Sequence, residues 1–178
     1  RLLSQKGVRE YVAAARKVRA VHPQTRFVLL GDRDANPTSV TLEELTEWVA
    51  EGVIEWPGRV DNVAEWVAST SVVVLPSYYR EGVPRSTQEA AALGRAIITT
   101  DSVGCRETVE EGRNGFLVPV RSSDALAEAM LRFIKNPALI TTMGEHSREL
   151  AEKRFDADGW NHAMAKLLTS DYRNEAAE

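Results

Sequence analysis

The sequence contains a single cysteine and lacks any long apolar run. Cys105 has no second cysteine with which to form an internal disulfide bond, a usage typical of proteins kept in a reducing compartment. No apolar stretch approaches the roughly 18–20 residues that a membrane-spanning helix needs. We therefore expect a cytoplasmic location for this chain.

An excess of positive charge is also missing. The 178 residues include 22 Lys and Arg against 26 Asp and Glu, which gives a net charge of −4. A weakly acidic chain without basic clusters is not typical of a protein that binds nucleic acid. Apolar residues make up 43% of the chain, enough for one soluble domain with its own core.

Several motifs of cofactor-dependent proteins are absent as well. No G-x-G-x-x-G motif follows an apolar run, which argues against a nicotinamide cofactor. No G-x-x-x-x-G-K-[ST] motif occurs either, which argues against a P-loop NTPase. The three histidines have no metal-ligand spacing. Two D-x-D triplets, at 32–34 and 156–158, lie in acidic loops where this spacing arises by chance. We expect neither a metal nor another cofactor.

What the sequence does contain is an alternation of short apolar runs and amphipathic segments. The runs are rich in β-branched residues and do not alternate with polar ones, as in strands buried on both faces of a parallel sheet. Strands are expected at residues 26–30, 53–56, 72–75, 96–99 and 115–118. Their order, with helices between them, predicts an α/β fold with a doubly wound, Rossmann-like parallel sheet.

The segments between these runs have the 3.6-residue periodicity of helices. Thr41 and Glu44 have the spacing of a capping box, and Asn62 is a suitable N-cap for another helix. Helices are expected at about residues 8–21, 41–50, 62–67, 84–94, 123–135, 137–153 and 158–170. We find no linker or repeat, so we expect one domain at 1–170 and a polar tail at 171–178.

The segment 75–101 carries two carboxylates around a helix start. Pro84 is favoured at the first position of a helix, so Glu81 would precede that helix and Glu89 would lie inside it. Ligands of parallel sheets bind beyond the carboxyl ends of the strands, where a helix N-terminus attracts phosphate. Glu89 would then lie roughly 7–8 Å along the helix, where it can accept hydrogen bonds from a ribose diol. Two solvated surface acids are the alternative.

The ten residues from Glu81 to Ala90 resemble the E-x7-E signature of the retaining glycosyltransferases of family 4, which have the GT-B fold. The resemblance covers nearly the whole chain, as the C-terminal, donor-binding half of such an enzyme. The sequence around the signature is similar to that of bacterial enzymes that build surface polysaccharides, including lipopolysaccharide. Further segments similar to the family are 1–7 (Arg-x4-Lys-Gly), 74–84, 94–119 and 154–156.

This resemblance implies roles for four charged residues. Arg1 and Lys6 correspond to the cations that bind the diphosphate of the donor and stabilise it as the leaving group. Glu89 corresponds to the acid that holds the ribose hydroxyls. Glu81 corresponds to the acid beside the transferred sugar. The resemblance therefore implies that Arg1, Lys6 and Glu81 are catalytic and that Glu89 binds the donor.

The resemblance also implies donor contacts in two loops. The backbone N–H groups of Gly82 and Val83, with Pro84 at the helix start, would reach oxygens of the sugar and phosphates. The nucleotide base would lie at the loop 56–62, which contains Gly58 and in which Arg59 can stack on the base. The donor would be a nucleoside-diphosphate sugar, with UDP favoured, and no metal would be required.

For the protein as a whole, the resemblance implies a partner domain. The chain does not begin with Met, so we expect it to be part of a longer enzyme whose N-terminal domain binds a saccharide or lipid-linked acceptor. Alone, the chain is expected to bind donor weakly and to transfer nothing. The full-length protein is expected to associate peripherally with the inner face of the cytoplasmic membrane.

Two other functions fit the same architecture. A nucleotide-sugar epimerase of GT-B type would use the same phosphate and ribose contacts. A non-catalytic doubly wound module, such as a receiver-like domain, would instead place its acids at strand ends to hold a metal. The combination of Arg-x4-Lys with E-x7-E favours sugar transfer over both.

Overall fold

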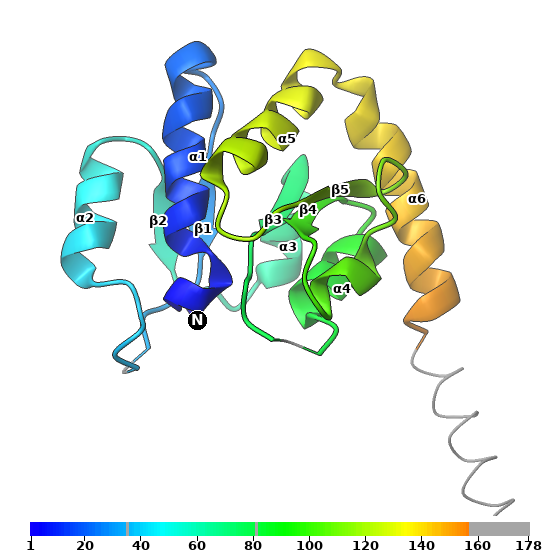
Figure 1. The fold of residues 1–178 in the computed structure, drawn as a ribbon, viewed down its shortest axis with the longest axis horizontal. Coiled ribbons are helices and arrows are strands. Elements are labelled where there is room, and N and C mark those ends of the chain that lie inside the picture. Colours follow the sequence, from blue (N-terminus) through cyan, green and yellow to red (C-terminus); the bar gives the residue numbers. More distant parts are fainter. Residues whose placement is uncertain (35, 81, 157–178) are drawn as a thin grey trace, which may run out of the picture.

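The computed structural model describes residues 1–34, 36–80 and 82–156 (Figure 1). The strands in this part are β1 (Val28–Leu30), β2 (Glu55–Gly58), β3 (Val72–Leu75), β4 (Ala96–Thr100) and β5 (Gly115–Val118). The helices are α1 (Val8–Val21), α2 (Leu42–Ala50), α3 (Val63–Ala68), α4 (Arg85–Ala92), α5 (Ser123–Lys135) and α6 (Ala138–Arg154). Two 3-10 turns, η1 (Ser4–Lys6) and η2 (Cys105–Thr108), were not predicted. The helix expected at 158–170 and the tail lie outside the described residues.

All strand pairs are parallel, but the strands form two sheets rather than the single sheet that we expected. One sheet has the order β1-β2 and the other β3-β4-β5. In the larger sheet the register is regular, with Val72 opposite Ala96 and Ile97 opposite Gly115. In the smaller sheet β1 is only three residues long and its register with β2 shifts between Val28 and Leu30. The predicted α/β class with parallel strands is confirmed.

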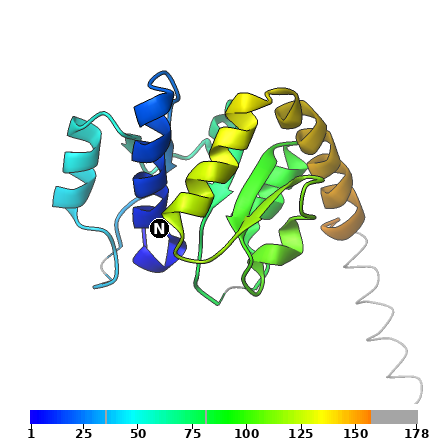
Figure 2. The ribbon, with the colours of Figure 1, turned by 45° about the horizontal axis from the view of Figure 1, so that its top comes forward.

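Helices cover both faces of β4, whose five residues are all buried. Ile98 belongs to a core cluster that includes residues of α1 and α5, whereas Ile97 packs with Ala90 and Ala91 of α4 and with Ala151 of α6. Figure 2 shows α1 and α5 side by side, and α4 with α6 at the other side of the sheet. The doubly wound arrangement is therefore confirmed around β4. Among the described helices, none combines the length and apolar character needed to cross a membrane.

Local signals placed most helix starts correctly. The capping box that starts α2 is present, because Thr41 Oγ1 accepts from the Glu44 N–H at 3.2 Å and Glu44 accepts from the Thr41 N–H at 2.8 Å. Asn62 does precede α3, but its predicted capping bond is wrong. Its amide donates to Glu65 at 2.7 Å instead of accepting from the backbone.

The second strand lies two residues later than predicted. The apolar residues Val53 and Ile54 are buried, but they precede β2, which contains Pro57. Because β2 is at the edge of its sheet, the missing N–H of a proline costs no ladder hydrogen bond on the open side. Apolar character therefore predicted correctly that Val53 and Ile54 are buried, but it did not predict where β2 begins.

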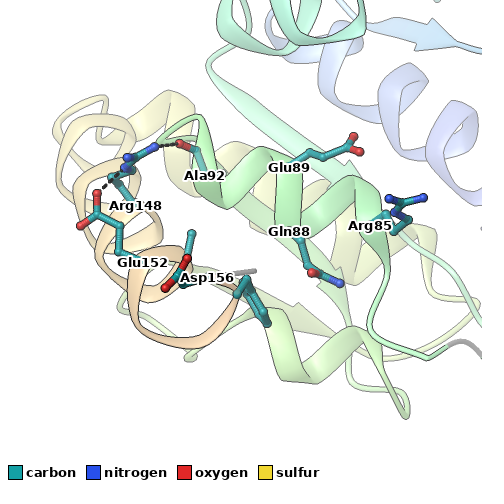
Figure 3. Close-up of a pocket in the computed structure, with 9 residues that line it drawn as sticks. Arg85, Gln88, Glu89, Ala92, Arg148, Glu152 and Asp156 are labelled. Atoms are coloured by element: carbon teal, nitrogen blue, oxygen red, sulfur yellow. Dashed lines mark hydrogen bonds and ion pairs between the residues drawn. The ribbon is translucent and has the colours of Figure 1, made fainter. Parts of the chain in front are cut away.

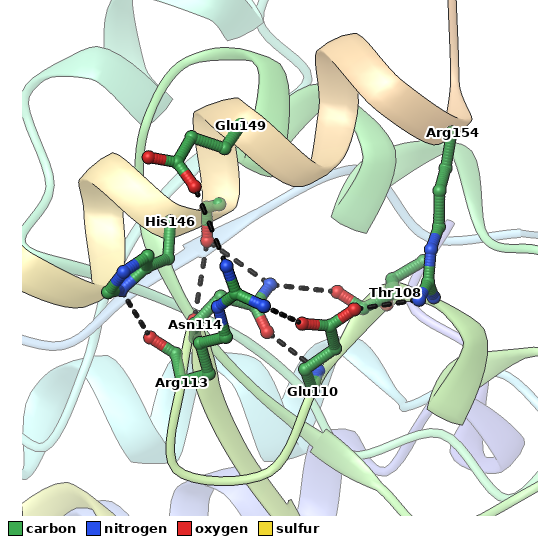
Figure 4. Close-up of polar contacts among 8 residues, drawn as sticks. Thr108, Glu110, Arg113, Asn114, His146, Glu149 and Arg154 are labelled. Atoms are coloured by element: carbon green, nitrogen blue, oxygen red, sulfur yellow. Dashed lines mark hydrogen bonds and ion pairs between the residues drawn. The ribbon is translucent and has the colours of Figure 1, made fainter.

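A buried asparagine joins the loop between β4 and β5 to α6 (Figure 4). Asn114 is 1% exposed, and its amide nitrogen donates to the Thr108 carbonyl at 3.1 Å and to Ser147 Oγ at 3.3 Å. Its amide oxygen accepts from the Glu110 N–H at 2.7 Å. Ser147 Oγ in turn donates to the Asn114 carbonyl at 3.3 Å. Each polar group of this side chain has a partner, so the loop and helix are held in one arrangement.

We expect Asn114→Ala to destabilise the chain by about 3 kcal/mol, because it leaves buried backbone groups without partners. Urea unfolding of the variant and the native chain measures this difference. Asn62→Ala is the matched control, since Asn62 is exposed and its side chain bonds only Glu65 among the described residues; its expected change is within about 0.5 kcal/mol. Equal stability of the two variants would contradict a structural role for the buried amide.

Candidate functional site

Three loops meet at the carboxyl ends of the strands. They follow β1, β2 and β3 and comprise the described residues of the ranges 31–41, 59–62 and 76–84. Since parallel strands end at the same edge, these loops share one end of the molecule with the N-terminus of α4 (Figure 1). This is the edge at which the sequence predicted a binding site.

The first 3-10 turn docks onto the loop after β3. The Gln5 carbonyl accepts from the Tyr78 N–H at 2.9 Å, from the Tyr79 N–H at 3.2 Å and from Ser77 Oγ at 3.2 Å. One carbonyl therefore holds three donors of a loop about 70 residues away in sequence. Because Lys6 directly follows Gln5, the amino-terminal turn brings Lys6 to the loop that leads into α4.

Gly7 makes this approach possible. Its φ of +76° lies in the left-handed region, and a Cβ built there would stand 2.1 Å from the Pro76 carbonyl oxygen. No side chain fits at that distance, so only glycine permits the close contact. The close contact with Pro76 thus explains why glycine follows Lys6 in the sequence.

The loop after β3 is also held from the far side of the larger sheet. Ser77 is fully buried, and its carbonyl accepts from Thr100 Oγ1 and from Ser102 Oγ. Arg121, which follows β5, lies over the Tyr78 ring at 4.5 Å. Its φ of 58° is uncommon for a residue other than glycine. Contacts from η1, from the end of β4 and from the segment after β5 therefore hold the residues that precede the signature segment.

Pro84 and the next turn orient the start of α4. Pro84 is buried and immediately precedes the helix, one residue earlier than its predicted role as the first helical residue, because its ψ of 128° is extended. Thr87 Oγ1 donates to the Pro84 carbonyl at 3.0 Å and the Gln88 amide to the Val83 carbonyl at 3.0 Å. The first N–H groups of any helix lack a carbonyl partner within the helix, so the start of α4 is suited to bind an anion.

Glu89 is exposed on α4, at the rim of an open groove of about 630 Å³ (Figure 3). The groove lies between α4 and the end of α6, where Arg148 donates to the Ala92 carbonyl at 2.6 Å and pairs with Glu152 at 2.7 Å. Figure 3 shows Glu89 extending away from Arg148 and Asp156. Its carboxylate has no hydrogen bond or ion pair within the described residues. It is therefore available to a ligand that approaches along α4.

Arg1 lies at the end of β1 instead of at the loop after β3. A Cβ on Gly31 would be 3.6 Å from the Arg1 backbone nitrogen, and the Arg1 guanidinium pairs with Asp34 at 3.3 Å. The pKa of Asp34 is lowered, first by the Asn36 N–H and then by Arg1. The acidic triplet at 32–34 therefore serves a turn and an ion pair in this structure, and the predicted meeting of Arg1 with the α4 N-terminus is not seen.

Gly58 and Arg59 stand at the end of β2. The Gly58 carbonyl accepts from the Gly31 N–H at 3.0 Å, which ties the ends of β1 and β2 together. Gly58 has a φ of +78° and no atom within 4 Å of a built Cβ, and Arg59 is exposed. Gly82, in the loop after β3, is likewise open. Space for a ligand therefore exists at both loops in which donor contacts were predicted.

A sequence model described as "Glycosyl transferases group 1" matches residues 1–136 of the chain. The chain belongs to this family. It is 30% identical over 149 residues to the Campylobacter jejuni N,N'-diacetylbacillosaminyl-diphospho-undecaprenol alpha-1,3-N-acetylgalactosaminyltransferase, covering 84% of the chain and 38% of that enzyme. Other bacterial relatives are named for colanic acid and capsular polysaccharide biosynthesis. The predicted family is confirmed, and these relatives are bacterial enzymes named for the synthesis of glycans.

Two solved structures confirm the fold. The chain matches Anabaena HepE in complex with UDP with a TM-score of 0.86 and 25% identity, covering 96% of the chain and 47% of HepE. It matches the C-terminal domain of the Francisella tularensis glycosyl transferase LpcC with a TM-score of 0.75 and 22% identity, covering 86% of the chain and 82% of that domain. The chain thus corresponds to the C-terminal, donor-binding half of a GT-B glycosyltransferase and spans less than half of its curated relatives.

Not every predicted residue of this donor-binding domain can be placed. Glu81 lies outside the described residues, as do the last two residues of the acidic triplet at 156–158. In the described ranges, no group of three or more His, Cys, Asp or Glu is arranged to hold a metal ion. Cys105 is buried and free.

Sequence reasoning missed the residues that assemble the site. Gln5 supplies the carbonyl that holds the loop after β3, and Arg121 covers Tyr78 from the far side of that loop. Neither residue has a local signal, because a backbone carbonyl carries no sequence information and a surface arginine has many possible roles. Only Gly7, beside Lys6, could have indicated a close backbone approach from sequence.

Proposed function

We propose that the parent enzyme transfers a hexosyl or N-acetylhexosaminyl group from a nucleoside-diphosphate sugar to an acceptor hydroxyl with retention of anomeric configuration. In this proposal the chain binds the donor, and UDP is the favoured nucleotide. The observation that carries it is the docking of the Lys6 turn onto the loop that leads into α4 and Glu89. This arrangement places Lys6, the N-terminus of α4 and the Glu89 carboxylate near the carboxyl ends of the strands.

The donor would lie across this edge from β2 to α4. Lys6, Arg1 and the α4 N-terminus would hold the diphosphate and stabilise it as it departs. Arg1 would exchange its exposed pair with Asp34 for the donor, at little cost because solvent screens an exposed ion pair. The base would lie against Gly58 and Arg59 at the end of β2.

Carboxylates would position the two sugars of the donor. Glu89 would accept hydrogen bonds from the ribose hydroxyls, roughly 7–8 Å along α4 from the phosphates. Glu81 would bind the transferred sugar, next to the backbone N–H groups of Gly82 and Val83. HepE, the relative solved with UDP and with UDP-glucose, supports a uridine nucleotide for this chain.

The rest of the enzyme would supply the acceptor site. We assign residues 1–170 to the donor domain and 171–178 to a tail, and we place the acceptor site in an N-terminal domain. The chain alone would bind donor without transferring sugar. The Campylobacter relative is named for a diphospho-undecaprenol acceptor, which supports a saccharide or lipid-linked acceptor and peripheral association with the inner face of the cytoplasmic membrane.

A nucleotide panel tests this function directly. We expect UDP, at about 100 times its Kd, to raise the melting temperature by roughly 5–10 °C, since ligand binding to the native state adds about 2.7 kcal/mol. GDP and ADP are compared at the same concentration, with and without EDTA, and uridine serves as the control without phosphate. An unchanged melting temperature with every nucleoside diphosphate would overturn the donor site and favour a non-catalytic module.

A further inference from the structure

Most arginines of the described chain have a partner. Arg9 and Arg26 pair with glutamates, Arg95 donates to backbone carbonyls and Arg121 stacks on a tyrosine. Within the described residues, the guanidinium groups that make no hydrogen bond, ion pair or ring contact belong to Arg33, Arg59, Arg80 and Arg85. These four side chains are therefore the candidates for holding an anionic ligand.

The four unpaired arginines share one edge of the molecule. Arg33 follows β1, Arg59 follows β2, Arg80 follows β3 and Arg85 is the first residue of α4. The same edge also carries Asp32, Asp61 and Asp101, and Arg33 interacts electrostatically with Glu43. The guanidinium groups of Arg59, Arg80 and Arg85 remain as donors that can bind an anionic ligand.

The donor does not need all of these cations. Its diphosphate carries about two negative charges, which Arg1, Lys6 and the α4 N-terminus would balance. Arg59 is assigned to the base. Arg80 and Arg85, which bracket the loop into α4, are left without a role in donor binding.

Arg85 is not neutralised by its own helix. It lies one turn before Glu89, and Figure 3 shows both side chains at a distance from the Arg148 cluster on α6. No ion pair joins Arg85 and Glu89, and an arginine that precedes a glutamate by four residues is the less favourable order on a helix. Arg85 and Glu89 therefore lie one turn apart on α4, and each can bind a separate group of a ligand.

Exposed apolar side chains accompany these arginines. Tyr79 is 51% exposed beside Arg80, and Val83 is 38% exposed two residues before Arg85. The same carboxyl edge exposes Val120 after β5. A loop that presents apolar surface and unpaired guanidinium groups together suits an anion carried on an apolar chain.

We propose that Arg80 and Arg85 bind the diphosphate of a lipid-linked acceptor beside the donor diphosphate. This inference rests on the proposed function. In a transfer with retention the acceptor hydroxyl approaches on the face of the departing phosphate, so an acceptor sugar held by the N-terminal domain would face the loop after β3. Its own diphosphate, one sugar ring away, then meets the two arginines that flank this loop. Both residues bind and orient the acceptor, and neither takes part in bond breaking.

Binding of farnesyl diphosphate to the full-length enzyme saturated with UDP tests this proposal. Calorimetry should show farnesyl diphosphate binding more tightly than inorganic pyrophosphate, and farnesol binding at least tenfold more weakly. The double variant R80Q/R85Q should lower the affinity for farnesyl diphosphate at least about tenfold, since two charge-assisted contacts are lost. Its affinity for UDP should change less than about twofold.

The matched control is the double variant R26Q/K135Q, which removes the same charge. Arg26 precedes β1 and Lys135 ends α5, so both lie toward the opposite edge, and the exposed Arg26 pair with Glu55 contributes little. Its affinity for farnesyl diphosphate should remain within about twofold of the native value.

Three results would overturn the acceptor assignment. They are an unchanged affinity of R80Q/R85Q for farnesyl diphosphate, an equal loss of affinity for UDP, and farnesyl diphosphate binding no more tightly than pyrophosphate. The second result would make both arginines donor residues. Failure of the native enzyme to bind any of UDP, GDP and ADP would instead overturn the proposed function, so the two failures are distinguishable.

Discussion

Replacing Glu89 with glutamine is expected to weaken UDP binding by roughly 10- to 100-fold, because a hydrogen bond to a charged group contributes about 1.5–3 kcal/mol. Glutamine keeps the shape of the side chain but removes the charge that strengthens two hydrogen bonds from the ribose diol. Glu89 is exposed and unbonded within the described residues, so the substitution should leave the free energy of unfolding unchanged. Calorimetric titration with UDP measures the effect.

Two comparisons separate a ribose contact from a general charge effect. Glu145→Gln removes the same charge from an exposed position on α6, and its UDP affinity should stay within about twofold of native. Inorganic pyrophosphate has no ribose, so its affinity should be the same for Glu89→Gln and the native chain. Native UDP affinity in Glu89→Gln would remove this residue from the donor site.

Gly7→Ala is expected to cost about 3 kcal/mol or more of folding free energy. The new Cβ would stand 2.1 Å from the Pro76 carbonyl oxygen and 2.7 Å from its carbonyl carbon, so the backbone must move. The left-handed φ adds a further cost of about 1–2 kcal/mol for a residue with a Cβ. The same movement should separate Gln5 from the loop that it holds, so UDP affinity should fall as well.

Gly52→Ala provides the matched control for this substitution. Gly52 has a φ of +70°, close to that of Gly7, but nothing lies within 4 Å of its built Cβ. Its expected cost is only the left-handed backbone term of about 1–2 kcal/mol. Urea unfolding of the two variants isolates the clash, and equal destabilisation would show that the approach of Gly7 to Pro76 contributes nothing.

Residues near one another in sequence were predicted well, for physical reasons visible in the structure. The helix at Val8–Val21 follows from apolar periodicity, and the start of α2 follows from a capping box between residues three apart. Such signals depend on one or two turns of chain. The limits of β3 and β5 also matched, because both are short apolar runs bounded by turn residues.

Boundaries failed where tertiary context competed with the local signal. The apolar residues Val53 and Ile54 were expected in a strand but precede it, because hydrogen bonding to the short β1 begins only at Glu55. Pro57 falls inside β2, which is tolerated at a sheet edge. Neither the edge position nor the short partner strand can be read from the segment itself.

The sequence by itself determined the family signature, the helices and strands, and the spacing between Glu89 and the start of its helix. These properties follow from side chains a few residues apart and from the fixed rise of a helix. Only the tertiary structure decided that the Gln5 carbonyl holds the loop at Tyr78, that Arg1 pairs with Asp34, and that Arg80 and Arg85 have no partner among the described residues. Such contacts join distant segments, and they form only when the whole core positions both partners.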